Sequence, residues 1–357
     1  MMDKLPEDAL VALEKTFKDR IRRPARNDGT GPGSALASVL PLHAEEVEML
    51  SRLADHYSIP LAAEGGGTAP GSVAVGGRML VRFDLMRGVR LPDHDEGWVE
   101  AEPGTPWLQL EDRLRLESVS LAVYPTSAPR ATVGGWLATD GLGVGSFEYG
   151  RLRENVLSVS VVLPGGERRE VPGEEIGAFL APGSTEGIIV GARLRTRRAV
   201  SDVPFAAGFD TMPDLAGTVT DLVEAKVRLW HLALLNPGMA RARSLGEDYL
   251  IFGAYPWERR AEVEEGLRGV VESRRGHSFP AADAYRAWGE RFFPIRPSIL
   301  PPRFPGVSRE FVSLTELPEK LKGAEDRASE VAVQGSVARS GEVLLLAVDA
   351  GEFGRAS

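Results

Sequence analysis

The stretch Tyr124–Gly150, YPTSAPRATVGGWLATDGLGVGSFEYG, decides how this chain is interpreted because glycine is unusually dense in it. A short apolar run, Trp136-Leu137-Ala138, separates the pair Gly134-Gly135 from the glycines that follow. Glycine permits positive φ and a close approach of the main chain, so backbone N–H groups can contact a flat or charged ligand directly. Taken alone, the stretch is also compatible with a glycine-rich turn between a helix and a strand.

A second glycine cluster, EGGGTAPG, occupies Glu64–Gly71 and directly follows the apolar run Leu61-Ala62-Ala63. Consecutive amides after a strand form a concave turn that suits a pyrophosphate, and Thr68 adds a hydroxyl donor. The cluster is not a dinucleotide fingerprint, because the spacing G-x-G-x-x-G does not follow the strand, and it is not a P-loop, because no Lys-Ser/Thr follows. Two such loops on one domain can face one extended ligand.

Length, charge and cysteine content restrict the class of protein. The chain has 357 residues, which suits two domains, and its net charge of −9 argues against a nucleic acid or an anionic membrane surface as partner. No apolar run is long enough to span a bilayer. The absence of cysteine rules out disulfides, thiolate nucleophiles and cysteine-bound metal centres in this chain. The mixed-charge start, MMDKLPEDALVALEKTFKDR, does not resemble a secretory signal, so we expect a cytoplasmic protein.

The hydrophobic pattern predicts helices and strands that are mixed without a regular strand–helix–strand repeat, which indicates an α+β fold. We expect residues 1–200 to form one domain. Residues 201–357 are expected to form a second, smaller domain with an antiparallel sheet and flanking helices, whose last strands either stay in it or pack back on the first domain. Expected helices are 6–20, 43–57, 106–116, 212–223, 256–274, 282–292 and 317–321, and expected strands include 37–41, 59–63, 79–83, 98–101, 156–163, 167–171, 187–196, 225–235, 249–255, 310–313, 330–336 and 343–348.

Five motifs in a fixed order give the chain a resemblance to a known family. They are AEGGGT, VEAEPGTPWLQL, YPTSAPRATVGGWLATDGLG, YGRLRENVLSVSVVLPGGE and GSTEGIIVGARL, and they lie between Val39 and Arg197. In this order they resemble the FAD-binding domain of the vanillyl-alcohol oxidase / p-cresol methylhydroxylase superfamily. Within it, the chain is most similar to the FAD-binding subunits of glycolate oxidase and to D-2-hydroxyacid (D-lactate) dehydrogenases.

The resemblance implies a two-subdomain FAD-binding domain followed by a cap domain that holds the substrate. It places Thr68 where a histidine often attaches the flavin covalently, so we expect FAD to be bound non-covalently. The histidine-containing metal motif of many D-2-hydroxyacid dehydrogenases has no counterpart, because Ala332–Arg339 contains no histidine, and we expect no metal. The cofactor-binding residues implied are Glu64, Gly65, Gly66, Gly67, Thr68, Pro125, Ser127, Thr132, Val133, Gly134, Gly135, Thr139, Gly141, Gly143, Tyr149, Gly150, Gly187, Ile188 and Ile189.

Candidate catalytic residues lie in the second half of the chain. Oxidation of an alcohol by a flavin needs a base for the hydroxyl proton, and a carboxylate substrate is commonly held by arginine. His231, within RLWHLALLNP, is the best candidate base, although a buried structural histidine explains it equally simply. Arg286, Arg291 and Arg296 in YRAWGERFFPIRP could bind an anionic substrate, unless they line a solvated helix face. Large aromatics such as Trp230 and Trp288 are more simply assigned to the core.

Three functions are compatible with these features. The first is an FAD-linked oxidase or dehydrogenase that acts on the CH–OH group of a small alcohol or 2-hydroxy acid, with a small molecule as substrate. The second is a flavin-binding, non-catalytic or electron-relay subunit of a heteromeric glycolate oxidase-like dehydrogenase, working with a companion dehydrogenase or Fe–S subunit. The third is a degenerate member that binds nucleotide weakly and serves as a regulator or scaffold.

Overall fold

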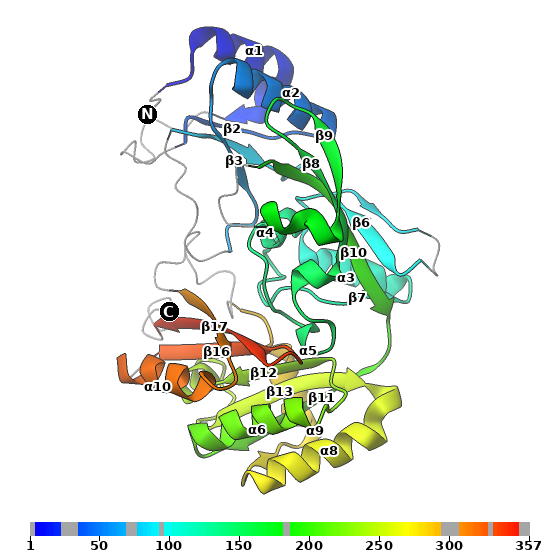
Figure 1. The fold of residues 1–357 in the computed structure, drawn as a ribbon, viewed down its shortest axis with the longest axis vertical. Coiled ribbons are helices and arrows are strands. Elements are labelled where there is room, and N and C mark those ends of the chain that lie inside the picture. Colours follow the sequence, from blue (N-terminus) through cyan, green and yellow to red (C-terminus); the bar gives the residue numbers. More distant parts are fainter. Residues whose placement is uncertain are drawn as a thin grey trace. The chain divides into compact units, whose positions relative to one another are not determined.

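The structure is a computed structural model that describes residues 4–22, 35–68, 77–92, 96–180, 186–293, 307–327 and 331–349 (Figure 1). The chain forms two compact units. Unit 1 comprises Met1–Leu121, Ala128–Asp140 and Val156–Arg197, and unit 2 comprises Ala122–Ser127, Gly141–Asn155 and Arg198–Ser357. Helices and sheets are mixed in both units, which confirms the predicted α+β class.

Unit 1 contains two sheets. The smaller has the strand order β1-β2-β4-β3, in which β2, β4 and β3 run parallel. The larger follows the order β5-β6-β10-β8-β9 with antiparallel neighbours, and β7 also pairs with β10. The strands are β1 Ile21–Arg22, β2 Ala37–Val39, β3 Leu61–Glu64, β4 Met79–Arg82, β5 Val89–Arg90, β6 Trp98–Ala101, β7 Val119–Leu121, β8 Val156–Val162, β9 Arg168–Pro172 and β10 Ile188–Arg198.

The helices of unit 1 cover these sheets. The apolar residues spaced three or four apart on α1 and α2, among them Leu13, Phe17 and Leu50, pack into one core with Val39 and Val81 of the parallel strands. That core holds the small sheet, and therefore the carboxyl end of β3, in place. The helical elements are α1 Glu7–Phe17, η1 Lys18–Arg20, α2 Ala44–His56, α3 Trp107–Leu116, α4 Val133–Leu137 and η3 Gly173–Ala178.

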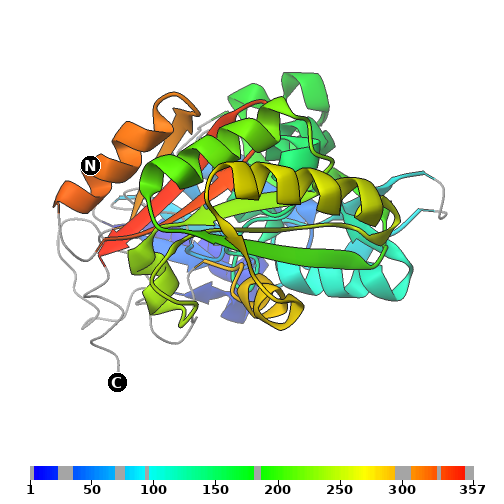
Figure 2. The same ribbon diagram turned by 90° about the horizontal axis from the view of Figure 1, so that it is seen from below.

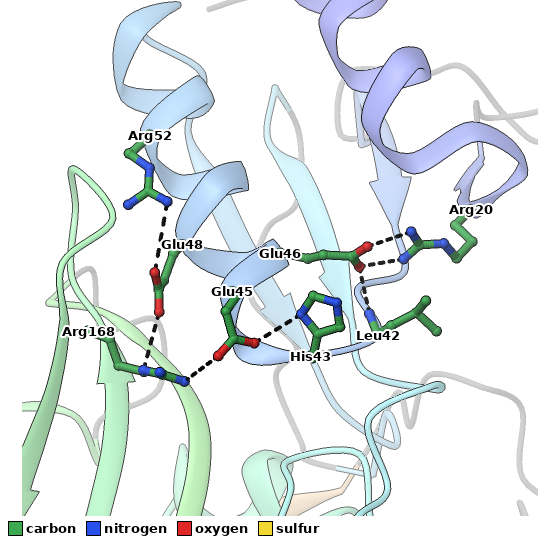
Figure 3. A network of polar contacts seen from close by, with 8 residues as sticks. All are labelled: Arg20, Leu42, His43, Glu45, Glu46, Glu48, Arg52 and Arg168. Carbon is green, nitrogen blue, oxygen red and sulfur yellow. Dashed lines mark hydrogen bonds and ion pairs between the residues drawn. The ribbon is translucent and has the colours of Figure 1, made fainter.

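Ion pairs fasten the first turn of α2 on both sides (Figure 3). Glu46 accepts hydrogen bonds from Arg20, one of them 2.6 Å long, and this contact lowers the pKa of the Glu46 carboxyl. On the other side, Arg168 of β9 lies 3.2 Å from both Glu45 and Glu48. Adjacent carboxylates at the start of α2 therefore join the helix to the segment before β1 and to the β8–β9 hairpin.

A buried carboxylate joins α3 to β7. Glu111 is almost fully buried, and it accepts hydrogen bonds from the Ser120 hydroxyl at 2.8 Å and from the backbone N–H of Leu121 at 2.8 Å. Arg115, one turn later on α3, donates to the same carboxylate at 2.6 Å. A buried charge is stable only when it is paired and hydrogen-bonded, and Glu111 satisfies both conditions.

Unit 2 is built on one seven-stranded antiparallel sheet with the order β14-β11-β13-β12-β16-β17-β15. The last two strands of the chain are inner members of this sheet, because β16 pairs with β12 and β17 pairs with both β16 and β15. The strands are β11 Asp202–Phe209, β12 His231–Leu235, β13 Tyr249–Pro256, β14 His277–Ser278, β15 Ser308–Ser313, β16 Val331–Val337 and β17 Glu342–Asp349.

Helices cover both faces of this sheet. Side chains alternate along β12, so that Leu232 and Leu234 enter one core while Ala233 and Leu235 enter another. The first core lies beneath α6, α8 and α10, of which α6 and α8 lie side by side over the sheet (Figure 2). The second core lies beneath α7 and α9. The helical elements are α5 Ser146–Tyr149, η2 Leu152–Asn155, α6 Met212–Glu224, α7 Pro237–Ala242, η4 Trp257–Arg259, α8 Arg260–Ser273, α9 Ala281–Gly289 and α10 Leu317–Arg327.

Several elements of unit 2 differ from the sequence prediction, and two of them have a clear physical reason. The strand expected at 225–235 starts only at His231, because α6 extends to Glu224 and Lys226 has a φ of 54°, which no strand permits. The strand β11 was not predicted, since Pro204 and Gly208 within it are typical of turns. Its pairing with the whole of β13 fixes it in the sheet. The five prolines of Pro294–Pro305 predict an extended loop, but this segment lies outside the described residues.

We expect Glu111→Gln to lower the free energy of unfolding by about 2 kcal/mol, because two buried donors then face a neutral amide. Asp112→Asn provides the control, since Asp112 is the exposed neighbour on the same helix. Urea denaturation at pH 7 measures both variants. Equal stability of the two would show that the buried carboxylate does not fasten β7 to α3.

Candidate functional site

The two glycine loops of unit 1 lie in direct contact. A methyl group on Gly65 would come within 2.6 Å of the Cα atom of Gly135, and one on Gly66 would come within 2.0 Å of the carbonyl oxygen of Arg130. Gly134 has the same constraint against Pro103, at 2.7 Å. No side chain fits between these segments, so glycine is required by the close approach itself. Segments about 70 residues apart in the chain thus form one continuous main-chain surface.

The amides of the first loop are available to a ligand. Among the residues that the structure describes, none accepts a hydrogen bond from the backbone N–H groups of Gly65, Gly66 or Gly67. Gly65 and Gly67 are exposed and Gly66 is half-buried, so a phosphate or pyrophosphate can reach these three successive amides. On the second loop, Thr132 accepts a hydrogen bond from Gly135 N–H at 3.3 Å, which fixes the turn.

One arginine lies between two carboxylates beside the first loop. Glu64 ends β3, and its carboxylate lies 3.6 Å from the guanidinium of Arg82, the last residue of the neighbouring strand β4. Arg82 also lies 3.3 Å from Asp84. Arg82 therefore offsets part of the repulsion that the two carboxylates would exert on a bound phosphate, and the three side chains together keep one net negative charge.

The other predicted cofactor residues of unit 1 occupy varied positions. Val133 is fully buried in the core, so only its backbone could face a ligand. The hydroxyl of Thr139 donates to the carbonyl of Trp136 at 3.1 Å. Ile188 and Ile189 are buried on β10 and pair with Val162 and Val161 of β8, directly after Gly187.

The remaining predicted cofactor residues belong to unit 2. Tyr124 and Val144 exchange backbone hydrogen bonds of 3.0 and 2.8 Å, which places Pro125 and Ser127 beside the Gly141–Gly145 segment. Gly143 lies against this bridge, because a methyl group there would come within 2.2 Å of the Tyr124 carbonyl oxygen. Gly141 accepts a hydrogen bond from Leu152 N–H at 3.0 Å. Tyr149 and Gly150 end α5, and Gly150 has a φ of 76°.

Arg291 lies in a cluster of aromatic residues in unit 2. Its guanidinium carbon lies 4.6 Å from the ring centroid of Trp288 and 4.2 Å from that of Phe292. Its Nε–H donates to the Tyr124 hydroxyl at 3.3 Å. Trp230 completes the cluster at 6.2 Å from Tyr124 and 5.9 Å from Trp288. Trp230 is fully buried, as the sequence predicted, and Trp288 contacts both Trp230 and Arg291. This cluster could not be read from the sequence, because α9 and β12 are far apart in it.

His231 lies in the same region, at the start of β12. It is fully buried between Phe252 and Trp288, whose ring centroids lie 6.2 and 5.8 Å away. Neither ring nitrogen has a hydrogen-bond partner among the described residues. Burial lowers the pKa of His231 to about 3, and the nearby cation Arg291 adds to this effect. The imidazole is therefore neutral at physiological pH, and no part of it is exposed in this conformation.

Of the other two candidate arginines, the structure describes Arg286. Arg286 is exposed on α9, where it lies 3.3 Å from Asp283. Arg296 lies outside the described residues. Within the described ranges, no group of three His, Asp or Glu side chains is arranged to hold a metal ion. No helix in the described part of the chain is long and apolar enough to cross a membrane.

Comparison with known proteins identifies the family. Residues 35–171 match the FAD binding domain family. A D-lactate dehydrogenase of Archaeoglobus fulgidus is 31% identical over 321 residues, which cover 82% of this chain and 69% of that protein. The chain belongs to the FAD-binding D-lactate dehydrogenase family. This confirms the resemblance to D-2-hydroxyacid (D-lactate) dehydrogenases.

A solved structure of low sequence identity shows the same fold. The structure of p-cresol methylhydroxylase with substrate bound aligns with a TM-score of 0.76 over 99% of this chain and 86% of that chain, at 14% identity. The mitochondrial D-lactate dehydrogenase [cytochrome] of Arabidopsis thaliana is 27% identical over 57% of this chain. The chain spans only 38% of the length of that plant protein. Unit 1, which holds the two glycine loops, contains most of the matched FAD-binding domain.

We expect Gly66→Ala to weaken FAD binding at least tenfold, because the new methyl group separates the two loops of this FAD-binding domain. Gly177→Ala is the control, since a methyl group there meets no atom within 4 Å. Titration of the apoprotein with FAD, followed by flavin fluorescence, gives both affinities. Unchanged affinity of Gly66→Ala would show that the contact between the loops is irrelevant to the cofactor.

We expect His231→Leu to make unit 2 less sensitive to acid. A histidine whose pKa falls from 6.5 to about 3 on folding contributes least at low pH, because the unfolded chain binds the proton that the folded chain excludes. Stability is therefore lost as pH falls from 6.5 towards 3, and at pH 4.5 the loss due to His231 is about 2–3 kcal/mol.

Urea denaturation at pH 7 and pH 4.5 tests this expectation. His231→Leu should equal or exceed the wild type at pH 7, since it removes two unpaired polar atoms, and should exceed it clearly at pH 4.5. His277→Gln, which replaces an exposed histidine of the same unit, is the control. Parallel losses in the wild type and His231→Leu would mean that the buried imidazole becomes protonated without cost.

Proposed function

We propose that this protein is an FAD-dependent oxidoreductase that oxidises a small 2-hydroxy acid or alcohol. The observation that supports the reaction type is the Arg291 cluster of unit 2. The Arg291 guanidinium lies against Trp288 and Phe292 and donates to the phenol oxygen of Tyr124. These contacts fix its orientation in an apolar setting. A fixed guanidinium fork is the group that best recognises a carboxylate.

Bound FAD supplies the acceptor for the hydride of the substrate. The loops at Gly65–Gly67 and Thr132–Gly135 hold the phosphates, without a covalent bond to the chain. Arg291 holds the substrate carboxylate, with Tyr124 as a second donor. Aromatic side chains around this pair exclude water and so strengthen its electrostatic interaction with the substrate.

His231 is the proposed base for the hydroxyl proton, and this role stays a prediction. In its favour, the imidazole is neutral and has no described hydrogen-bond partner. Against it, the side chain has no exposed surface, so neighbouring side chains must move before a substrate hydroxyl can reach either nitrogen, and a pKa of about 3 makes the imidazole a weak proton acceptor. A base would show a loss in kcat on His231→Gln substitution with little change in KM.

A second candidate function is that of a flavin-binding or electron-relay subunit in a heteromeric, glycolate oxidase-like dehydrogenase. The chain contains no cysteine, so it carries no cysteine ligand for an Fe–S cluster of its own. Electrons from the flavin would then leave through a companion dehydrogenase or Fe–S subunit.

Anaerobic reduction of the FAD-loaded protein separates these functions. The full chain is mixed with D- or L-lactate, glycolate, 2-hydroxyglutarate or a sugar alcohol, and the visible flavin band is followed. Bleaching of the isolated chain by a hydroxy acid supports the first function. Bleaching only after a co-purified partner is added supports the second. A colourless protein that gains no spectrum from added FAD would contradict both.

Arg291→Met should reduce kcat/KM for the 2-hydroxy acid by roughly 10- to 100-fold, because a charge-assisted pair to the carboxylate is lost. For a neutral alcohol the same substitution should have little effect. Arg286→Met tests the other candidate arginine. Arg260→Met is the control, since Arg260 also stacks on an indole, 4.8 Å from exposed Trp257, but outside this cluster. Equal losses on the acid and the alcohol would argue against carboxylate recognition by Arg291.

A further inference from the structure

Two buried polar side chains hold the segment that carries Arg291. The guanidinium of Arg243, at the end of α7, donates to the carbonyl oxygen of Glu290 and, at 3.2 Å, to that of Phe292. It also donates to the side-chain oxygen of Gln334 at 2.6 Å. The amide nitrogen of Gln334, on β16, donates in turn to the carbonyl oxygen of Arg291 at 3.1 Å. Three successive carbonyls, at positions 290, 291 and 292, are thus bound by one connected pair of side chains.

The pair is buried in the sheet core. Arg243 is 4% exposed and Gln334 is 1% exposed. Burial lowers the pKa of Arg243 to about 9, which leaves the guanidinium charged at neutral pH. No described carboxylate forms an ion pair with it, and its Nε–H has no described partner. Charge buried in this way is costly to stability, and an apolar pair of similar volume would be cheaper. A cost of this kind is expected where the pair fixes a particular geometry.

That geometry is the position of Arg291. The segment emerges from α9 directly after Trp288, whose carbonyl accepts a hydrogen bond from the Arg291 side chain at 3.0 Å. Two residues further on, Phe293 N–H donates to the carbonyl of Thr126 at 2.6 Å, next to the Tyr124 that Arg291 contacts. Arg243 and Gln334 bind the carbonyls of residues 290–292. The backbone of Arg291 therefore cannot shift along the sheet without breaking buried hydrogen bonds.

We propose that Arg243 and Gln334 are positioning residues that hold the Arg291 guanidinium in place for the carboxylate of a 2-hydroxy acid. This inference rests on the proposed function for the carboxylate, but the placement of Arg291 can be measured without substrate. Arg243 touches neither the substrate nor the cofactor in this account. It acts through the backbone of residues 290–292, and Gln334 supplies the only described side-chain contact to the Arg291 carbonyl.

The first test uses a signal from the ring on which Arg291 stacks. The full chain is labelled with 5-fluorotryptophan, and Trp288→Phe assigns the ¹⁹F resonance of Trp288. Arg291→Met then gives the shift that follows loss of the guanidinium. Arg243→Met should move the Trp288 resonance in the same direction. Gln334→Glu keeps an acceptor for Arg243 but cannot donate to the Arg291 carbonyl. This variant should therefore also move the Trp288 resonance.

Controls separate positioning from a general loss of stability. Leu222→Ala opens a cavity in the core on the other face of the same sheet and should lower Tm without moving the Trp288 resonance. Arg243→Lys keeps the positive charge but lacks the planar guanidinium. Its Trp288 resonance should therefore lie between those of the wild type and Arg243→Met. If Arg243→Met fails to fold, Gln334→Glu and Arg243→Lys carry the test, because both retain the buried cation.

The second test is kinetic. With a hydroxy acid that bleaches the flavin, Arg243→Lys and Gln334→Glu should raise KM by roughly tenfold and change kcat far less, as expected when binding of the carboxylate is weakened. If no hydroxy acid bleaches the flavin, the proposed function fails while the ¹⁹F result still decides the positioning role. The inference would be overturned if Arg291→Met moves the Trp288 resonance while Arg243→Met and Gln334→Glu leave it at the wild-type position.

Discussion

The structure depends on the approach of two backbones that only glycine permits. Gly65 and Gly66 lie so close to Gly135 and Arg130 that one methyl group would overlap main-chain atoms. The approach costs conformational entropy, since glycine is the residue most restricted by folding. What it provides is a surface of main-chain amides, three of them without a described protein partner, at the end of a parallel strand. The core of α1, α2 and the small sheet holds that strand still.

In unit 2 the candidate site is formed by buried side chains rather than by main-chain amides. Its sheet is covered by helices on both faces, yet the face beneath α7 and α9 contains charged and polar groups among the aromatics. His231, Arg243 and Gln334 are all buried there. Buried polar groups reduce stability unless they are satisfied, and only Arg243 and Gln334 are largely satisfied. The polar contacts converge on Arg291, which is why this face, and not the one beneath α6 and α8, carries the proposed substrate contact.

The sequence predicted some of these features for identifiable physical reasons. Helices such as α2 and strands such as β8 have strong apolar periodicity, and the glycine clusters show where backbone must come close to backbone or ligand. Other features depend on contacts that no local pattern records. Arg243 and Gln334 look like surface residues in the sequence, because long polar side chains are seldom buried. Tyr124 belongs to the glycine-rich stretch, and its contact with Arg291 joins residues 167 positions apart.

Hydrogen–deuterium exchange of the apoprotein, with and without FAD, tests the central claim most directly, because it reports on the loop amides themselves. If the two loops form one surface for the dinucleotide, peptides covering 61–68 and 130–137 should both gain protection when FAD is added. Peptides from α6, in unit 2, should change little and serve as the internal reference. Protection of one loop without the other, or of neither at saturating FAD, would contradict the account.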